Sequence, residues 1–175
     1  MSDSVFLTDG NGTITKTRYE SGSVGELIIP EYVGSERITA IGAEAFYNCI
    51  ELTSIVMPDS VTSIGDYAFA HCYSLTNISS PAVISIGYNA FGDCPNLTSV
   101  SFPKATSIGE NAFHTCPNLT SISFPATTSI GNNAFQFGYG LTSVSFPAVV
   151  SIGEAAFDTC YNLINADFPK ATNIG

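Results

Sequence analysis

Five cysteines recur along the chain at a nearly fixed interval and are the first candidates for chemistry. The intervals are 23, 22, 22 and 44 residues, and they separate Cys49, Cys72, Cys94, Cys116 and Cys160. If each interval is one turn of a repeating structure, the thiols form a column with Cβ atoms about 5 Å apart, beyond the roughly 3.8 Å that a disulfide needs. A column also does not converge on one point, as zinc ligands must. We therefore expect five buried, free thiols that pack as small apolar side chains, with disulfides between neighbouring repeats as the alternative.

The other candidate groups are weaker. His71 and His114 fall in different positions of the repeat, and neither a Ser-His-Asp grouping nor a G-x-S-x-G motif accompanies them, so we expect both on the surface. The segment DGNGTITKTRYE mimics a calcium loop, but Ile14 stands where such a loop needs glycine. The alternation after that turn favours a β-hairpin instead. We expect no catalytic residue, no metal and no cofactor.

Charge and length restrict the class of protein. The 15 Asp and Glu residues against five Lys and Arg give a net charge of −10, which repels nucleic acid. No apolar run approaches the length of about 18 residues that a membrane-spanning helix needs. The apolar patch at the start, Val5–Leu7, is too short for a secretory signal. The sequence thus predicts no nucleic-acid partner, no membrane insertion in this segment and no signal peptide in this chain.

An internal repeat of 22 or 23 residues must position all of these groups. The pair Ile-Gly begins at residues 41, 64, 86, 108, 130, 152 and 174, and Ala-Phe follows at 45, 68, 90, 112, 134 and 156. Columns of Leu begin at Leu52 and columns of Pro at Pro58. Periods of this length are typical of a solenoid with one coil per repeat.

The shape of one coil follows from its residues. In LTSVSF, Val100 and Phe102 alternate with serines, which indicates a strand that Pro103 ends. ATSI is a second short strand, and GENAFHTC has the i, i+4 spacing of one helical turn. The glycine after each Ile predicts a positive φ or a close backbone approach, because a phosphate loop would need several clustered glycines. The chain is therefore predicted to be an α/β repeat solenoid whose coils are unstable alone and must be stacked.

The two ends differ from the middle. Residues 1–23 are predicted to form an N-terminal hairpin cap, and residues 24–175 a solenoid of about six coils, truncated at the C-terminus. The last coil lacks its turn, so its apolar face of Leu163, Ala166 and Phe168 has no following coil. An unpaired edge recruits other chains, which predicts weak self-association through this end.

The pattern LTSI-x-x-P-x-x-x-x-SIG-x-x-AF-x-x-C resembles the BspA-like leucine-rich repeat family over residues 24–175. The resemblance implies a right-handed superhelix with a parallel concave sheet and short convex strands. It also implies a non-catalytic binding module at the cell surface or secreted, with adhesion to proteins or other cells. The resemblance names no ligand, and both a protein and a glycan partner stay open. A structural spacer with no ligand of its own is the alternative function.

The outward positions of the expected concave sheet are the candidate binding surface. They are Thr98, Ser99, Ser101, Thr120, Ser121, Ser123, Thr142, Ser143, Ser145, Asn165 and Asp167. Hydroxyl ladders between strands are the structural alternative for this surface. Phe137 and Tyr139 are candidate exposed aromatics for recognition. Phe137 has an alternative role, in which it folds inward to fill the space left where Gly138 interrupts the cysteine column.

Overall fold

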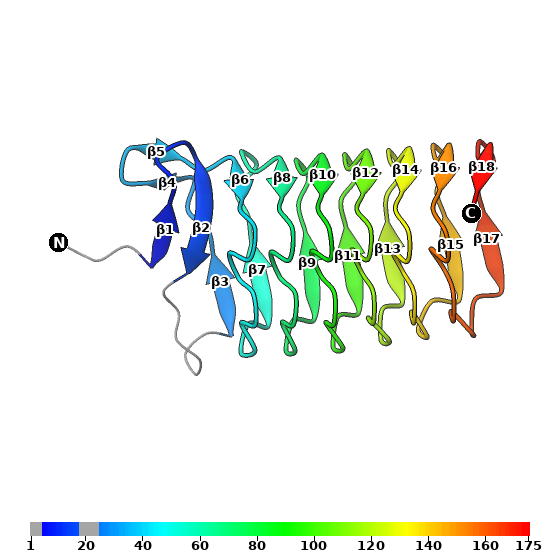
Figure 1. The fold of residues 1–175 in the computed structure, drawn as a ribbon. Coiled ribbons are helices and arrows are strands. Elements are labelled where there is room, and N and C mark those ends of the chain that lie inside the picture. The colour runs from blue at the N-terminus through cyan, green and yellow to red at the C-terminus, as the bar shows by residue number, and fades with distance from the viewer. Residues whose placement is uncertain (1–4, 18–24) are drawn as a thin grey trace.

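The computed structural model describes residues 5–17 and 25–175. These residues form an elongated stack of about six coils, in which strands from successive coils pair side by side (Figure 1). The described residues contain no disulfide and no cis peptide bond, so the stack is held by packing and hydrogen bonds.

Two sheets run along the stack. Sheet 1 has nine strands in the order β1-β2-β6-β8-β10-β12-β14-β16-β18. Their bounds are β1 (Phe6–Thr8), β2 (Thr13–Thr17), β6 (Ala40–Ile41), β8 (Ser63–Ile64), β10 (Ser85–Ile86), β12 (Ser107–Ile108), β14 (Ser129–Ile130), β16 (Ser151–Ile152) and β18 (Asn173–Ile174). Only β1 and β2 pair antiparallel among these, and each later strand pairs in parallel with the same residues of the next coil.

Sheet 2 is formed by the three-residue strands that were predicted from LTSVSF. Its strands pair as β3-β7-β9-β11-β13, with β15-β17 as a separate pair. Their bounds are β3 (Glu26–Ile28), β7 (Ser54–Val56), β9 (Asn77–Ser79), β11 (Ser99–Ser101), β13 (Ser121–Ser123), β15 (Ser143–Ser145) and β17 (Asn165–Asp167). The register sets Val100 against Ile122 and Val144 against Ala166, so the apolar residues of successive strands share one side of sheet 2, as the alternation predicted. In the last coil Ala166 is exposed.

The segment after each Ile-Gly pair is a pair of β-turns, and the single helical turn that we predicted is wrong there. In the second coil, the Ala68 amide donates to the Gly65 carbonyl across Tyr67, whose φ is 55°. His71 has φ 60° in the next turn, and the equivalent two positions have positive φ in all six coils. Positive φ at the third residue is the mark of a type II turn and is incompatible with an α-helix. Because the described residues contain no helix, the predicted α/β class is corrected to a β-solenoid.

Alternate amides of these turns bond to the next coil instead of within a helix. The Tyr67 amide donates to the Tyr88 carbonyl (2.8 Å), the Phe69 amide to the Ala90 carbonyl (2.8 Å) and the His71 amide to the Gly92 carbonyl (2.9 Å). An α-helical turn would instead direct the His71 amide to the Tyr67 carbonyl, four residues earlier in the chain. The double turn thus extends the inter-coil ladder beyond the two sheets.

Close backbone approach explains the glycine that follows each Ile. None of these glycines has a positive φ, so that alternative is excluded. A Cβ atom at Gly109 would lie 2.5 Å from the Gly87 carbonyl oxygen, and one at Gly131 would lie 2.4 Å from the Glu110 nitrogen. The coils therefore meet glycine on glycine, and a side chain here would push them apart.

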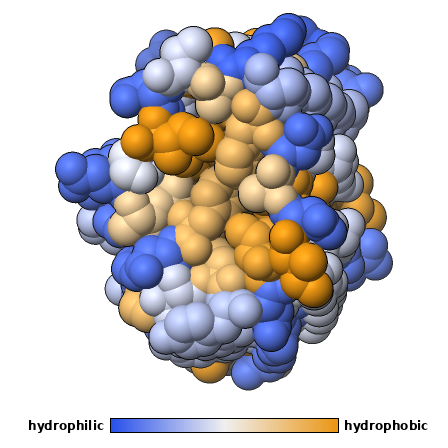
Figure 2. Space-filling view, turned by 90° about the vertical axis from the view of Figure 1, so that its right-hand side faces the viewer, coloured by the Kyte–Doolittle hydropathy of each residue, from blue (hydrophilic) through white to orange (hydrophobic). Residues whose placement is uncertain are grey.

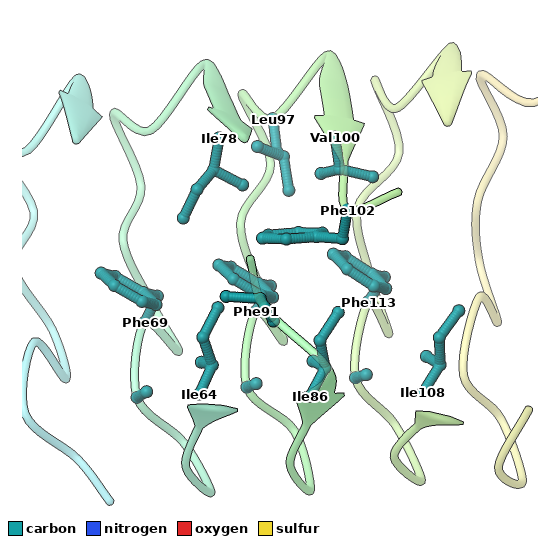
Figure 3. Close-up of a cluster of buried hydrophobic side chains, with 14 of the residues drawn as sticks. Ile64, Phe69, Ile78, Ile86, Phe91, Leu97, Val100, Phe102, Ile108 and Phe113 are labelled. Carbon is teal, nitrogen blue, oxygen red and sulfur yellow. The ribbon is translucent and has the colours of Figure 1, made fainter. Parts of the chain in front are cut away.

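The core is a set of ordered columns. Phe46, Phe69, Phe91, Phe113, Phe135 and Phe157 stack with centroids 5.0–5.3 Å apart and planes within 8°. Figure 3 shows three of these rings beside the parallel row of Ile64, Ile86 and Ile108. A second column, Phe102 to Phe146, packs against the first. Because these columns run from coil to coil, each coil is stabilised mainly by its neighbours.

Two small hairpins meet at the N-terminal end. The extra loop of the first coil forms a second antiparallel pair, β4 (Tyr32–Val33) and β5 (Glu36–Arg37). The Glu36 carboxylate accepts hydrogen bonds from the Gly12 amide and the Thr8 hydroxyl of the first hairpin. The predicted domain boundary at residues 23 and 24 lies outside the described residues, and the capping role of the hairpin stays a prediction.

Sheet 2 is interrupted between β13 and β15, which are the only neighbouring strands of this sheet in the described residues that do not pair. The spacing there is visibly wider than between other neighbours in Figure 1. Ile122 is partly buried on one side of the interruption, whereas Val100 is 2% exposed in the continuous part of the sheet. On the turn side of the same coil, a Cβ at Gly140 would lie 2.7 Å from the Leu119 carbonyl oxygen. This coil therefore approaches its predecessor closely at Gly140 and opens away from it at the strands.

The C-terminal end of the stack presents apolar side chains. Figure 2 views this end, and apolar groups occupy its centre with polar groups around them. Phe168 and Leu163 are partly buried here, and Ile164 and Ile174 are 82% and 63% exposed.

Candidate functional site

The outward side chains of sheet 2 are accessible along the stack. Ser99 and Ser101 are half-buried, and the other predicted surface residues are exposed. The register aligns Ser99 with Ser121 and Ser101 with Ser123 across β11 and β13. We call the outward side chains of β11, β13, β15 and β17 the serine face.

The threonine that precedes each strand forms a hydrogen-bonded ladder. The Thr76 hydroxyl donates to the Thr53 carbonyl (3.1 Å), the Thr98 hydroxyl to the Thr76 carbonyl (2.9 Å) and the Thr120 hydroxyl to the Thr98 carbonyl (3.3 Å). These threonines thus serve stability, as the ladder alternative predicted. At Thr142 the ladder stops, because the strands on either side of the interruption do not pair.

The serine hydroxyls of the same strands are used differently. Within the described residues, Ser145 is the one serine of β11, β13 and β15 whose hydroxyl has a protein partner, the Asp167 carboxylate at 3.2 Å. Ser99, Ser121 and Ser143 present hydroxyl groups that take no part in coil-to-coil bonding. These hydroxyls are therefore available to a ligand.

The first coils contribute a different surface that the sequence analysis missed. Ile28 and Val56 are 65% and 48% exposed on β3 and β7, in the positions that serines occupy later. An open groove of about 440 Å³ lies here, and its lining includes Glu26, Ser54 and Asn77. The sequence did carry a signal for this surface. The segments ELII and LTSIVM have Ile28 and Val56 where the LTSVSF pattern has a serine.

The interruption of sheet 2 divides the predicted site residues. Ser121 and Ser123 lie at the edge of the larger group of strands, and Ser143 and Ser145 belong to the pair with Asn165 and Asp167. The structure therefore does not bring the candidate residues together as one continuous surface.

Phe137 does not fill the space beside Gly138. Its ring is half-buried on the turn column, edge-on to His114 (centroids 5.3 Å apart, planes at 83°) and 6.4 Å from Tyr139. Tyr139 is exposed and stacks on Tyr161 at 5.9 Å. The aromatic side chains thus form an outer row.

The cysteine column is a column of free thiols, and Cys49, at the start, is only partly buried. The Cys94 thiol donates to the Phe69 carbonyl at 3.2 Å, and Cys116 donates to the Phe91 carbonyl at 3.3 Å. Burial raises the pKa of the Cys94 thiol from 9.0 to about 12 and raises the pKa of Cys116 well above its ordinary value. These protonated, buried thiols are unsuited to act as nucleophiles.

The segment that mimics a calcium loop is a turn closed by its own backbone. The Asp9 carboxylate accepts from the Asn11 amide (2.8 Å) and the Thr13 amide (3.1 Å), and these bonds lower the pKa of Asp9. Across residues 5–17 and 25–175, no three His, Cys, Asp or Glu side chains gather as a metal-binding group. These same residues include no helix with the length and apolar character needed to cross a bilayer.

The geometry and the repeats match one family of proteins. A family model described as "BspA type Leucine rich repeat region (6 copies)" matches residues 13–136 and 39–164. The chain belongs to the BspA-type leucine-rich repeat family. No curated protein sequence matches the chain significantly.

Solved structures of leucine-rich repeat proteins share the fold of this BspA-type chain. The T. pallidum leucine-rich repeat protein is 27% identical, with a TM-score of 0.89 over 98% of this chain and 83% of its own. A leucine-rich repeat protein of Bacteroides ovatus is 30% identical, with a TM-score of 0.78 over 95% of this chain and 45% of its own. A leucine-rich cell surface protein of Faecalibacterium prausnitzii is 28% identical, with a TM-score of 0.65 over 95% and 53%. This chain thus spans about half the length of two of these three proteins.

Proposed function

We propose that this BspA-type chain is a non-catalytic binding module that recognises a protein through the serine face. The observation that supports the proposal is that different side chains of sheet 2 have different roles. Threonine hydroxyls and inward apolar side chains hold the coils together, whereas Ser99, Ser121 and Ser143 are free for a partner. Solenoids commonly bind through such extended open surfaces.

Adhesion at a cell surface, or from a secreted protein, is the finer form of this proposal. It draws support from the cell-surface description of the Faecalibacterium protein. A glycan is the second class of ligand, because hydroxyl-bearing side chains hydrogen-bond sugars as well as peptides.

An array of purified extracellular proteins and glycans, probed with the labelled chain, tests the proposal. We expect binding to a protein. We expect Ser121→Arg to abolish this binding, because a long charged side chain then covers the paired strands β11 and β13. Val150→Arg is the matched control, since the Val150 side chain is 45% exposed outside sheet 2 and carries no group that hydrogen-bonds to a neighbouring coil. Equal loss with both variants contradicts the assignment to the serine face.

The spacer is the alternative function, favoured by the near-identity of the serine columns from coil to coil. A spacer binds nothing on the array at any concentration tested. That result, with a folded chain confirmed by circular dichroism, contradicts the binding module.

Weak self-association through the β17 and β18 end is a separate proposal. Ile164 and Ile174 are exposed there, and a second copy would cover both. Sedimentation over a concentration series should show a reversible dimer, which Ile164→Asp weakens. A strict monomer at high concentration contradicts it.

A further inference from the structure

Exposed aromatic rings form a row along the stacked β-turns, on a different part of each coil from the serine face. Tyr47, Tyr73, Tyr139 and Tyr161 are 46%, 45%, 39% and 81% exposed. His71, His114 and Phe137 lie on the same β-turns, and their rings are half-buried. We call these seven side chains the aromatic row.

The rings of the row contact one another between coils in two groups, because the turn segment 88–96 that separates the groups contributes no ring to the row. Tyr47 lies edge-on to His71 at 5.2 Å, at the N-terminal end of the row. At the other end, His114 meets Phe137, and Tyr139 stacks on Tyr161 at 5.9 Å with planes 15° apart. The rings are thus held in place by one another and need little ordering when a ligand binds.

The charge along the same turns has one sign. The six turn segments, residues 43–51, 66–74, 88–96, 110–118, 132–140 and 154–162, contain no Lys or Arg. They contain seven carboxylates, Glu44, Glu51, Asp66, Asp93, Glu110, Glu154 and Asp158.

One of these carboxylates contacts a ring of the row, and a second lies on the last turn. Asp93 lies 3.9 Å from His71, and Asp158 accepts a hydrogen bond from Gln136 at 2.7 Å. Hydrogen bonds from Gln136 and Thr159 lower the pKa of Asp158, so this group is ionised at neutral pH. Negative charge therefore lies beside the His71 ring and, in the last coil, on the same turn as Tyr161.

We propose that the aromatic row binds an extended, arginine-rich segment of a partner protein. A guanidinium group stacks on aromatic faces and bonds carboxylates, so it matches both features of the row. Six coils spaced by about 4.8 Å span about 24 Å, the length of roughly seven extended residues. The net charge of −10 would attract such a segment from a distance.

This site lies beyond the proposed function, because it uses the turns and leaves sheet 2 untouched. The two proposals can therefore be tested independently. A failure to bind through the serine face does not affect the proposal for the aromatic row, and a failure to bind through the aromatic row does not affect the proposal for the serine face.

Fluorescence polarisation with a labelled heptapeptide, Arg-Ser-Arg-Ser-Arg-Ser-Arg, tests the proposal. We expect binding that weakens as salt is raised. Tyr139→Ala and Tyr161→Ala should each lower the affinity about two- to fivefold, the range of an exposed cation–π contact. Asp158→Asn should lower the affinity for the peptide by up to about fivefold.

Matched controls separate the row from general attraction. Tyr32→Ala removes a tyrosine that is 52% exposed on β4, and Asp59→Asn removes an exposed carboxylate outside the turns. Neither should change the affinity by as much as twofold. A peptide with citrulline in place of arginine has the same shape without the charge, and it should not bind.

Several results would overturn the proposal. They are no binding of the arginine peptide at low salt, equal binding of the citrulline peptide, or the same loss with Tyr32→Ala as with Tyr161→Ala. Binding of a neutral hexasaccharide, with the same sensitivity to Tyr161→Ala and no binding of the arginine peptide, would also overturn it and assign the row to a glycan.

Discussion

Phe91 and Phe113 lie one coil apart with ring centroids separated by 5.1 Å and planes within 2° of parallel (Figure 3). Both rings are fully buried. This relationship is a pure translation along the stack, and it recurs between every neighbouring pair of the phenylalanine column. A defect in one coil is therefore felt by the coils on both sides.

Truncation in the middle of this column should cost more than truncation at its end. Phe91→Ala is expected to lower the free energy of unfolding by about 3 to 5 kcal/mol, because the cavity lies between two coils that cannot collapse. Phe157→Ala should have a smaller effect, since Phe157 is only partly buried. Urea unfolding followed by circular dichroism measures both, and equal losses would contradict inter-coil stacking as the main source of stability.

Buried thiols should make the protein sensitive to alkaline pH. The pKa of Cys94 is raised by burial from 9.0 to about 12, so the unfolded state releases its proton first. The stabilising contribution is complete below pH 9 and is lost as pH rises toward 12. Between pH 8 and pH 10, this thiol accounts for a loss of about 1.4 kcal/mol.

The variant Cys94→Ala isolates that contribution from other groups that titrate in the same range. Urea unfolding at both pH values should show a loss smaller by about 1.4 kcal/mol in the variant. The same pH dependence in both proteins would show that Cys94 is ionisable in the folded state.

Ser80 stands in the inward column that phenylalanine occupies from Phe102 onward, and its buried hydroxyl has no partner within the described residues. An unsatisfied buried hydroxyl is destabilising, so Ser80→Ala should raise the free energy of unfolding by about 1 kcal/mol. Thr127 is the matched contrast, because its buried hydroxyl donates to the Ala105 carbonyl at 2.7 Å. Thr127→Val should lower stability by a similar amount, and a loss of stability in Ser80→Ala would mean that its hydroxyl is satisfied in solution.

The interruption of sheet 2 should be detectable by hydrogen exchange. The Ser121 amide donates to the Thr98 carbonyl at 3.1 Å, whereas β15 does not pair with β13. We expect the amides of Ser143 and Ser145 to exchange faster than those of Ser121 and Ser123, because unpaired amides need no opening to exchange. Equal protection would show that the sheet is continuous in solution.

The repeat predicted the columns of the fold because a period of 22 residues places like residues above one another. Inward Val100 and the Ile-Gly contacts follow directly from that period. The turn conformation could not be predicted, because the i, i+4 spacing of Ala112 and Cys116 fits a helical turn and a double β-turn equally well. The positive φ of Tyr67, Phe137 and Ala155 carries no signal in those residue types.

The candidate site was predicted only in part. The repeat identified the serine columns, but it could not reveal that β13 and β15 separate, because the strands of these two coils have the same pattern as the paired ones. The groove beside Val56 was missed because the first coils depart from the common pattern. Of the aromatic row, the sequence identified Phe137 and Tyr139, whereas Tyr47, His71 and His114 come from other positions of the repeat and were not grouped with them.

An environment-sensitive dye on the serine face reports whether a protein partner binds there. The native thiols from Cys72 to Cys160 are buried, so Ser121→Cys in a Cys49→Ala background offers a single reactive thiol. Thr128→Cys in the same background places the dye outside sheet 2. With the strongest protein bound on the array, the account predicts a change in emission at position 121 and none at 128. Binding that changes emission at 128 alone, or at neither position, would contradict it.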